Sequence, residues 1–131
     1  MTLFANQVPE LFTSADLNED ISKINSAELQ NLLKQNKFTA VQCVASWNGR
    51  YDRELFDLLL SQTSIGDLKI ALLNCDDQTN WPLLRELNLT NVPCVILYTG
   101  VKISSIIRGL PSTELLNEEL SKLLQDYQAS V

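Results

Sequence analysis

Residues 41–49 read Val-Gln-Cys-Val-Ala-Ser-Trp-Asn-Gly, a mostly apolar run, interrupted by Gln42, that ends in an aromatic residue and two turn-forming residues. The apolar run extends from Phe38 to Ala45 and is rich in β-branched residues, which is typical of a strand buried inside a sheet. The segment Asp52 to Ser61 then carries leucines and a phenylalanine in a stripe broad enough for a helix. We therefore expect a central strand that leads through a turn into a helix pressed against the sheet.

The rest of the chain alternates between strand-like and helix-like patterns. Asn25 followed by Glu28 forms a capping box, which predicts the start of a helix. Trp81-Pro82 places a proline in the first turn of a short helix. Further strands are expected at 21–24, 68–74, 94–98 and 103–108, and a last helix at 112–127. This order predicts an α/β fold with a central mixed β-sheet sandwiched by helices.

Residues 47–51 read Trp-Asn-Gly-Arg-Tyr, and two more segments accompany them, Val92-Pro93 before one predicted strand and Arg108-Gly109 after the last. With the element order, these motifs resemble the thioredoxin family over roughly residues 20–127. The resemblance implies a thioredoxin fold in which a cis Pro93 faces residues 47–51. We expect a thioredoxin-like domain over residues 20–131, preceded by an N-terminal extension over residues 1–19.

The same resemblance implies a lost activity. Thioredoxins carry Trp-Cys-Gly-Pro-Cys at this motif, so Asn48 and Tyr51 stand where the family has its two thiols. Neither side chain can form a disulfide, which excludes the family's thiol–disulfide exchange at this turn. Arg50 replaces the proline, Gln42 replaces a buried Asp that assists proton transfer, and Leu72 replaces a lysine often paired with it. We therefore expect neither proton-handling groups nor disulfide oxidoreductase activity here.

A binding surface is another use for this turn. Trp, Tyr and Arg dominate binding hot spots, and in the family the residue before the cis proline pairs with an extended substrate peptide. The predicted partner-binding residues are Trp47, Asn48, Arg50, Tyr51, Val92 and Pro93. The competing interpretations are structural: Trp47 covers the core, Asn48 offers its side-chain oxygen to the first free N–H groups of the helix, and Arg50 is solvated.

The three cysteines have different expected surroundings. Cys43 lies inside a predicted buried strand, facing away from Gln42, and is expected to be inert. Cys75 ends a strand and is expected to be half exposed. Cys94 follows Pro93 directly and is the candidate reactive thiol.

Composition limits the classes of function. The chain has 131 residues, 45% of them apolar, which is enough for one domain with its own core. Its net charge of −6, without a basic run, argues against nucleic acid and anionic membranes as partners. The chain contains no histidine, and the adjacent Asp76 and Asp77 lack a third ligand, so we expect no metal site and no cofactor.

The expected location is cytoplasmic, with an organelle matrix as the alternative. Residues 1–12 lack the basic and apolar regions of a secretory signal. No apolar run reaches the length of about 18 residues that predicts a transmembrane helix. Three widely spaced cysteines without a Cys-x-x-Cys pair suit a reducing compartment.

These observations predict a redox-inactive thioredoxin-like domain that binds protein or an extended peptide, as an adaptor, assembly factor or chaperone-like subunit. A homodimer and a place in a larger complex both remain open. The alternative is a thiol- or glutathione-dependent oxidoreductase, or an iron–sulfur-handling protein, that uses Cys94. One thiol cannot complete a protein-only cluster site, which normally takes four ligands.

Overall fold

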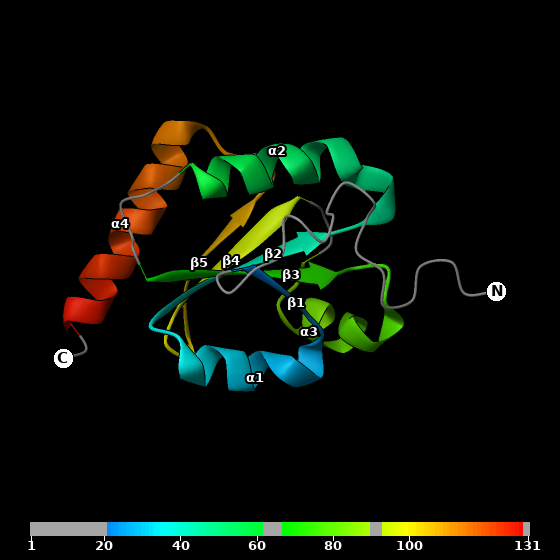
Figure 1. Ribbon diagram of the computed structural model, residues 1–131, viewed down its shortest axis with the longest axis horizontal. Helices are drawn as coiled ribbons and strands as arrows, with labels where there is room; N and C mark the ends of the chain where they lie inside the picture. Colours follow the sequence, from blue (N-terminus) through cyan, green and yellow to red (C-terminus); the bar gives the residue numbers. More distant parts are fainter. Residues whose placement is uncertain (1–20, 62–66, 90–92, 130–131) are drawn as a thin grey trace.

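The computed structural model describes residues 21–61, 67–89 and 93–129, so the extension predicted over residues 1–19 lies outside the described part. Figure 1 shows the elements in chain order: β1 (Ile21–Ile24), α1 (Ser26–Gln35), β2 (Phe38–Val44), α2 (Gly49–Leu60), β3 (Leu68–Asn74), α3 (Trp81–Glu86), β4 (Cys94–Thr99), β5 (Lys102–Arg108) and α4 (Thr113–Ala129). Short 3-10 turns over Ser46–Asn48 and Gln78–Asn80 lead into α2 and α3.

The strands form one sheet in the order β1-β3-β2-β4-β5. β1, β3 and β2 run parallel, whereas β4 is antiparallel to both β2 and β5. α2 and α4 cover one face of the sheet, and α1 and α3 cover the other (Figure 1). The predicted α/β architecture, a mixed sheet sandwiched by helices, is confirmed.

β2 lies at the centre of the sheet and is buried along its whole length, as its mostly apolar sequence, interrupted by Gln42, predicts. Successive side chains of a strand point to opposite faces, so β2 contributes to two cores. Ala40 and Val44 pack with leucines of α2 and α4, whereas Val41 and Cys43 pack with leucines of α1. The prediction that Cys43 faces away from Gln42 is confirmed.

The helix boundaries follow local signals. Asn25 Oδ1 accepts from the Glu28 backbone N–H at 3.0 Å, and the Asn25 N–H donates to the Glu28 carboxylate at 3.0 Å, which confirms the predicted capping box. α2 begins at Gly49, earlier than the predicted Asp52, because the 3-10 turn Ser46–Asn48 continues directly into the helix.

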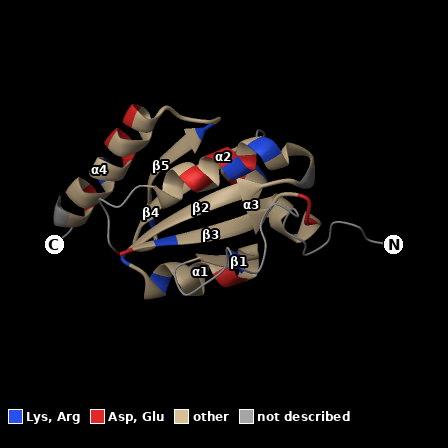
Figure 2. Ribbon diagram, turned by 45° about the horizontal axis from the view of Figure 1, so that its top comes forward, with Lys and Arg blue, Asp and Glu red and all other residues tan. Residues whose placement is uncertain are grey.

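Charged residues lie mainly on the helices (Figure 2). Along the outer face of α2, Arg50 lies 3.6 Å from Glu54 and Arg53 lies 3.1 Å from Asp57, each pair separated by one helical turn. This face therefore presents both signs of charge.

The segments that the family resemblance places together lie at one end of the central strands, which we call one edge of the sheet. The carboxyl ends of the parallel strands β2 and β3 meet there, with Val44 in register with Asn74. β4 begins at the same edge, because its antiparallel register places Cys94 opposite Cys43. The turn before α2 and Pro93, which precedes β4, therefore flank the same strand ends.

Candidate functional site

The turn between β2 and α2 exposes its two aromatic side chains. Trp47, in the 3-10 turn, is 72% exposed, and Tyr51, in the first turn of α2, is 49% exposed. The interpretation that Trp47 covers the core is therefore wrong, because most of its surface is open. Exposed aromatic side chains at the start of a packed helix offer apolar area to a partner.

Asn48 occupies the N-cap position of α2, but its side chain makes no capping hydrogen bond to the described backbone. Asn48 Nδ2 instead donates to Asp52 Oδ1 at 3.0 Å, and the residue is buried. The predicted bond to the first N–H groups of the helix is therefore wrong. The Asn48 side chain binds the Asp52 carboxylate, one turn further along α2, in preference to the backbone N–H groups, because charge-assisted hydrogen bonds are stronger than neutral ones.

Asp52 is a fully buried acid beneath this turn. Its Oδ2 accepts the Ala45 N–H at 2.9 Å. Burial raises the pKa of Asp52 from 3.8 to about 6, although the hydrogen bonds from Ala45 and Asn48 favour the charged form and act in the opposite direction. A buried carboxyl whose pKa is raised to about 6 therefore lies under the turn, in addition to the amide of Gln42 and the side chain of Leu72 that the sequence analysis considered.

The sequence analysis predicted no role for Asp52 beyond the start of an amphipathic helix. The signal lies in the spacing of α2, whose buried residues are Asp52, Leu55, Phe56 and Leu59. These positions follow the i, i+3, i+4, i+7 pattern of a single helical face. An acid on the apolar face of a helix could therefore have been noticed before the fold was known.

Gln42 joins β2 to α2. It is fully buried, and its Nε2 donates to the backbone oxygen of Asp52 at 2.7 Å. Its Oε1 accepts no hydrogen bond from the described residues. Leu72 is its register partner on β3, so the amide and the leucine lie side by side where the family resemblance implies an acid and a lysine.

Arg50 extends into solvent from the first turn of α2. Its side chain is 82% exposed and lies 3.6 Å from Glu54. The guanidinium carbon also lies 5.9 Å from the centre of the Tyr51 ring. An ion pair this exposed contributes little to stability, so Arg50 is available to a partner.

Pro93 lies on the other side of the same edge and is buried. Its carbonyl oxygen accepts the Gly109 N–H at 2.9 Å. Gly109 has a φ of 85°, a conformation that glycine adopts without steric strain, so the glycine fits this turn. Val92, the predicted peptide-pairing residue, lies outside the described residues.

Comparisons with known proteins identify the fold. No family model and no curated protein matches the chain. Oxidized mitochondrial thioredoxin 3 from Saccharomyces cerevisiae superposes with a TM-score of 0.64 at 22% identity, over 77% of this chain and 94% of that one. A thioredoxin variant from Halobacterium salinarum gives 0.63 at 19% identity, over 76% and 86%. The chain has a thioredoxin fold. At these identities the likeness concerns the fold alone.

Within this thioredoxin fold, three free cysteines meet on the sheet face opposite Gln42. Cys43 and Cys94 are fully buried, whereas Cys75 is partly exposed, as predicted. Contacts with Cys75 and Cys94, followed by burial, raise the pKa of Cys43 well above its ordinary value. The hydrogen bond with Cys43 lowers the pKa of Cys94, assisted by the charge of Arg108.

The burial of Cys94 bears on the alternative function. A thiol with no exposed surface is out of reach of glutathione in the described conformation. The geometry therefore does not favour Cys94 as an independent reactive thiol. Within the described residues, no group of three or more Cys, Asp or Glu side chains has an arrangement that could hold a metal ion.

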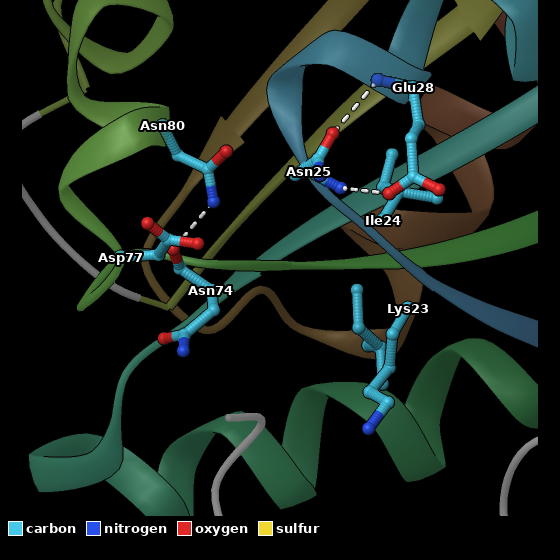
Figure 3. Close-up of a pocket in the computed structure, with 8 residues that line it drawn as sticks. Lys23, Ile24, Asn25, Glu28, Asn74, Asp77 and Asn80 are labelled. Carbon is cyan, nitrogen blue, oxygen red and sulfur yellow. Dashed lines mark hydrogen bonds between the residues drawn. The ribbon is translucent and has the colours of Figure 1, made fainter. Parts of the chain in front are cut away.

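A small polar cavity of about 130 Å³ lies between the start of α1 and the ends of β1 and β3 (Figure 3). Its polar groups bind one another: Asn80 Nδ2 donates to the Asn74 carbonyl at 2.9 Å, and Asn80 Oδ1 accepts the Ser26 N–H at 2.7 Å. Asn25 and Glu28 form the capping box on its other side. We interpret this cavity as a structural junction that ties α1 to the loop before α3.

No helix in the described ranges is both long and apolar enough to cross a bilayer.

Proposed function

We propose that this chain is a protein-binding domain with a thioredoxin fold that performs no thiol–disulfide exchange at the turn before α2. Its binding surface is the aromatic edge, which we define as Trp47 and Tyr51. The observation that carries the proposal is their exposure, 72% and 49%, at the turn where the family resemblance implies reactive thiols. Exposed Trp and Tyr side chains are the residue types most enriched in binding hot spots.

The surroundings of the turn support binding more than chemistry. The Asn48 side chain points inward to Asp52 and is buried, so its amide is not presented to a substrate. Asp52 has no exposed surface and its carboxylate oxygens accept hydrogen bonds from Ala45 and Asn48. These bonds brace the start of α2, and a rigid support lowers the entropy cost of binding through the aromatic edge.

An extended peptide is the partner that this edge would suit. We propose that its backbone pairs with Val92, the residue before Pro93, while its side chains pack on Trp47 and Tyr51. The Pro93 carbonyl is bonded to Gly109, and pairing at the residue before the proline is the form of strand addition that the family resemblance implies. Arg50, exposed beside Tyr51, would interact with an acidic group of the partner.

In this proposal the domain acts as an adaptor, assembly factor or chaperone-like subunit in the cytoplasm or in an organelle matrix. Its three free thiols support a reducing compartment. Self-association through the aromatic edge, as a homodimer, is the competing form of the same binding activity.

The test compares the double variant Trp47→Ala/Tyr51→Ala with the control Leu60→Ala/Leu115→Ala. The control residues are 44% and 41% exposed, on the far end of α2 and on α4. Partners captured by the full-length protein are identified, purified and titrated against each variant. Two hot-spot truncations should weaken binding by about 100-fold or more, and the control should bind like the wild type. Equal affinities for both variants would move the interface away from the aromatic edge.

A second measurement addresses the absence of disulfide exchange. Reduction of a protein disulfide by dithiothreitol should proceed at the same rate with and without the purified chain. Reductase activity that persists after replacement of Cys43, Cys75 and Cys94 would contradict the proposal and every thiol mechanism considered for this chain.

A further inference from the structure

The tertiary structure gathers three cysteines that are widely separated in sequence. Cys43 on β2 faces Cys94 on β4 in the antiparallel register. Cys43 is also in register with Leu73 on β3, and Cys75 follows two residues later, just beyond the end of the strand, where it packs against the core cluster of Cys43 and Leu73. The Cys75 N–H donates to the Val44 carbonyl at 2.7 Å, which holds Cys75 against the end of β2. The three thiols accordingly lie within one packed cluster of side chains.

The register that places Cys43 directly opposite Cys94 is one that a disulfide can span. Residues directly opposite each other on antiparallel strands have Cα atoms about 4.5 to 5.5 Å apart, and disulfides span Cα separations of about 4.4 to 6.8 Å. A bond between these sulfurs therefore requires side-chain rotation with little movement of the backbone.

Access to the three thiols differs. Cys43 and Cys94 have no exposed surface, whereas Cys75 is partly exposed at the end of β3. The Trp81 ring nitrogen donates to the Cys75 carbonyl at 2.9 Å, so this indole lies next to the accessible thiol. A dissolved reagent therefore reaches the cluster first at Cys75.

We propose that Cys43, Cys75 and Cys94 form an oxidant-sensitive thiol relay, in which a hydroperoxide reacts with Cys75 and the oxidation ends as a buried Cys43–Cys94 disulfide. The relay is distinct from the aromatic edge, because it lies on the other face of β2 and uses none of its residues. It modifies the protein rather than turning over a substrate.

The chemistry proceeds in three balanced steps. The Cys75 sulfur attacks the hydroperoxide, the O–O bond breaks, and an alcohol leaves with the thiol proton, so that Cys75 becomes a sulfenic acid. The Cys43 sulfur then attacks the Cys75 sulfur, the S–O bond breaks, and water leaves. Finally the Cys94 sulfur attacks Cys43, Cys75 departs as a thiolate and takes the Cys94 proton. Two thiols lose two electrons and two protons, and the hydroperoxide is reduced to alcohol and water.

The direction of the last step follows from the burial of the final pair. A disulfide between two fully buried residues is shielded from attacking thiols, whereas the intermediate Cys43–Cys75 bond retains a partly exposed sulfur. Oxidation therefore moves inward from the accessible thiol to the protected pair.

The experiment exposes the full-length reduced protein to hydrogen peroxide, stops the reaction with an alkylating reagent, and maps peptides without reduction. The wild type should fall from three free thiols to one, with the Cys43 and Cys94 peptides joined. Cys75→Ser should slow formation of that disulfide by about tenfold or more, because the accessible thiol is gone. Cys94→Ala should stop at a Cys43–Cys75 disulfide.

Three outcomes would overturn the relay. The first is a wild type that keeps all three thiols under conditions that oxidise a cysteine peptide. The second is a Cys75→Ser protein that forms the Cys43–Cys94 bond as fast as the wild type. The third is oxidation of Cys75 to its sulfinic acid without any disulfide. The wild-type map depends on no substitution, so a variant that folds poorly does not affect the central result.

Discussion

Gln42 and Cys43 are neighbours on β2, yet they face two regions with opposite chemistry. On the side of Gln42, the start of α2 holds the Asn48 amide, at a position where the family resemblance implies a thiol, and beneath it the buried acid Asp52. On the side of Cys43, thiols from three different strand ends meet in a mostly apolar core. A strand that sends alternate residues to opposite faces can thus separate two kinds of chemistry by a single residue.

A motif that a strand end lacks therefore describes only the face of the sheet on which that motif would lie. The absence of cysteines from residues 47–51 excludes exchange there, and it carries no information about the face that Cys43 shares with Cys75 and Cys94. Four predictions test this contrast between the acid face and the thiol face.

The largest effect should come from a charge on the thiol face. Cys43→Asp places a carboxylate at a fully buried position, which should lower the free energy of unfolding by about 4 kcal/mol or more. Cys75→Asp, at the partly exposed thiol, should cost less than about 1 kcal/mol. Urea unfolding measures both. Similar costs at the two positions would contradict the difference in burial.

Removing the charge on the acid face should stabilise the protein above neutral pH. Because the pKa of Asp52 rises from 3.8 to about 6 on folding, the folded state retains a proton that the unfolded chain has released. The contribution of Asp52 to the free energy of unfolding is therefore fully present below about pH 4. It falls by roughly 3 kcal/mol as the pH rises through about 6. In Asp52→Asn the Asn48 amide can rotate, which keeps the hydrogen bond between residues 48 and 52. We therefore expect the free energy of unfolding to rise by roughly 2 kcal/mol at pH 8.

The check on Asp52→Asn is its free energy of unfolding relative to the wild type, measured from pH 4 to pH 8. The difference should be near zero or negative at the acidic end and grow toward the alkaline end. A difference that stays constant with pH would show that Asp52 does not titrate in this range.

Asn48→Ala separates two explanations for the burial of Asn48. Loss of the Asn48–Asp52 hydrogen bond should cost about 1 kcal/mol, and it should raise the pKa of Asp52 further because a bond that favours the charged form is gone. The fall in stability with rising pH should then extend to higher pH than in the wild type. A loss of similar size with an unchanged pH profile would restore the capping explanation, which the described contacts do not support.

The smallest effect is expected at Arg50. Arg50→Ala removes an exposed ion pair with Glu54 and should change the free energy of unfolding by about 0.5 kcal/mol or less. Arg53→Ala is the matched substitution on the same helix. The Arg53 guanidinium lies 3.1 Å from the Asp57 carboxylate, closer than Arg50 lies to Glu54, and 5.2 Å from the centre of the Phe56 ring. Arg53→Ala should cost more, and thermal unfolding of both variants decides the order.

Much of the fold could be predicted from short-range patterns. The strand of residues 38–44, the capping box at Asn25 and the hairpin near Gly100 each depend on a few neighbouring residues. Hydrophobic periodicity and capping groups act over one or two turns, so their information is present in any short window. The motif Trp47 to Tyr51, in which the family resemblance implies thiols at the positions of Asn48 and Tyr51, could be recognised in the same way.

The site depended on contacts that no short window contains. The orientation of Asn48 depended on a buried carboxylate beneath it, and the exposure of Trp47 depended on how the turn leaves the sheet. The meeting of Cys75 and Cys94 with Cys43 required the parallel register of β3 and the antiparallel register of β4 on either side of β2. The sequence by itself determined side-chain identity and local periodicity. Strand register and side-chain burial were decided only when distant segments packed together, because both depend on the surfaces of all the elements in contact.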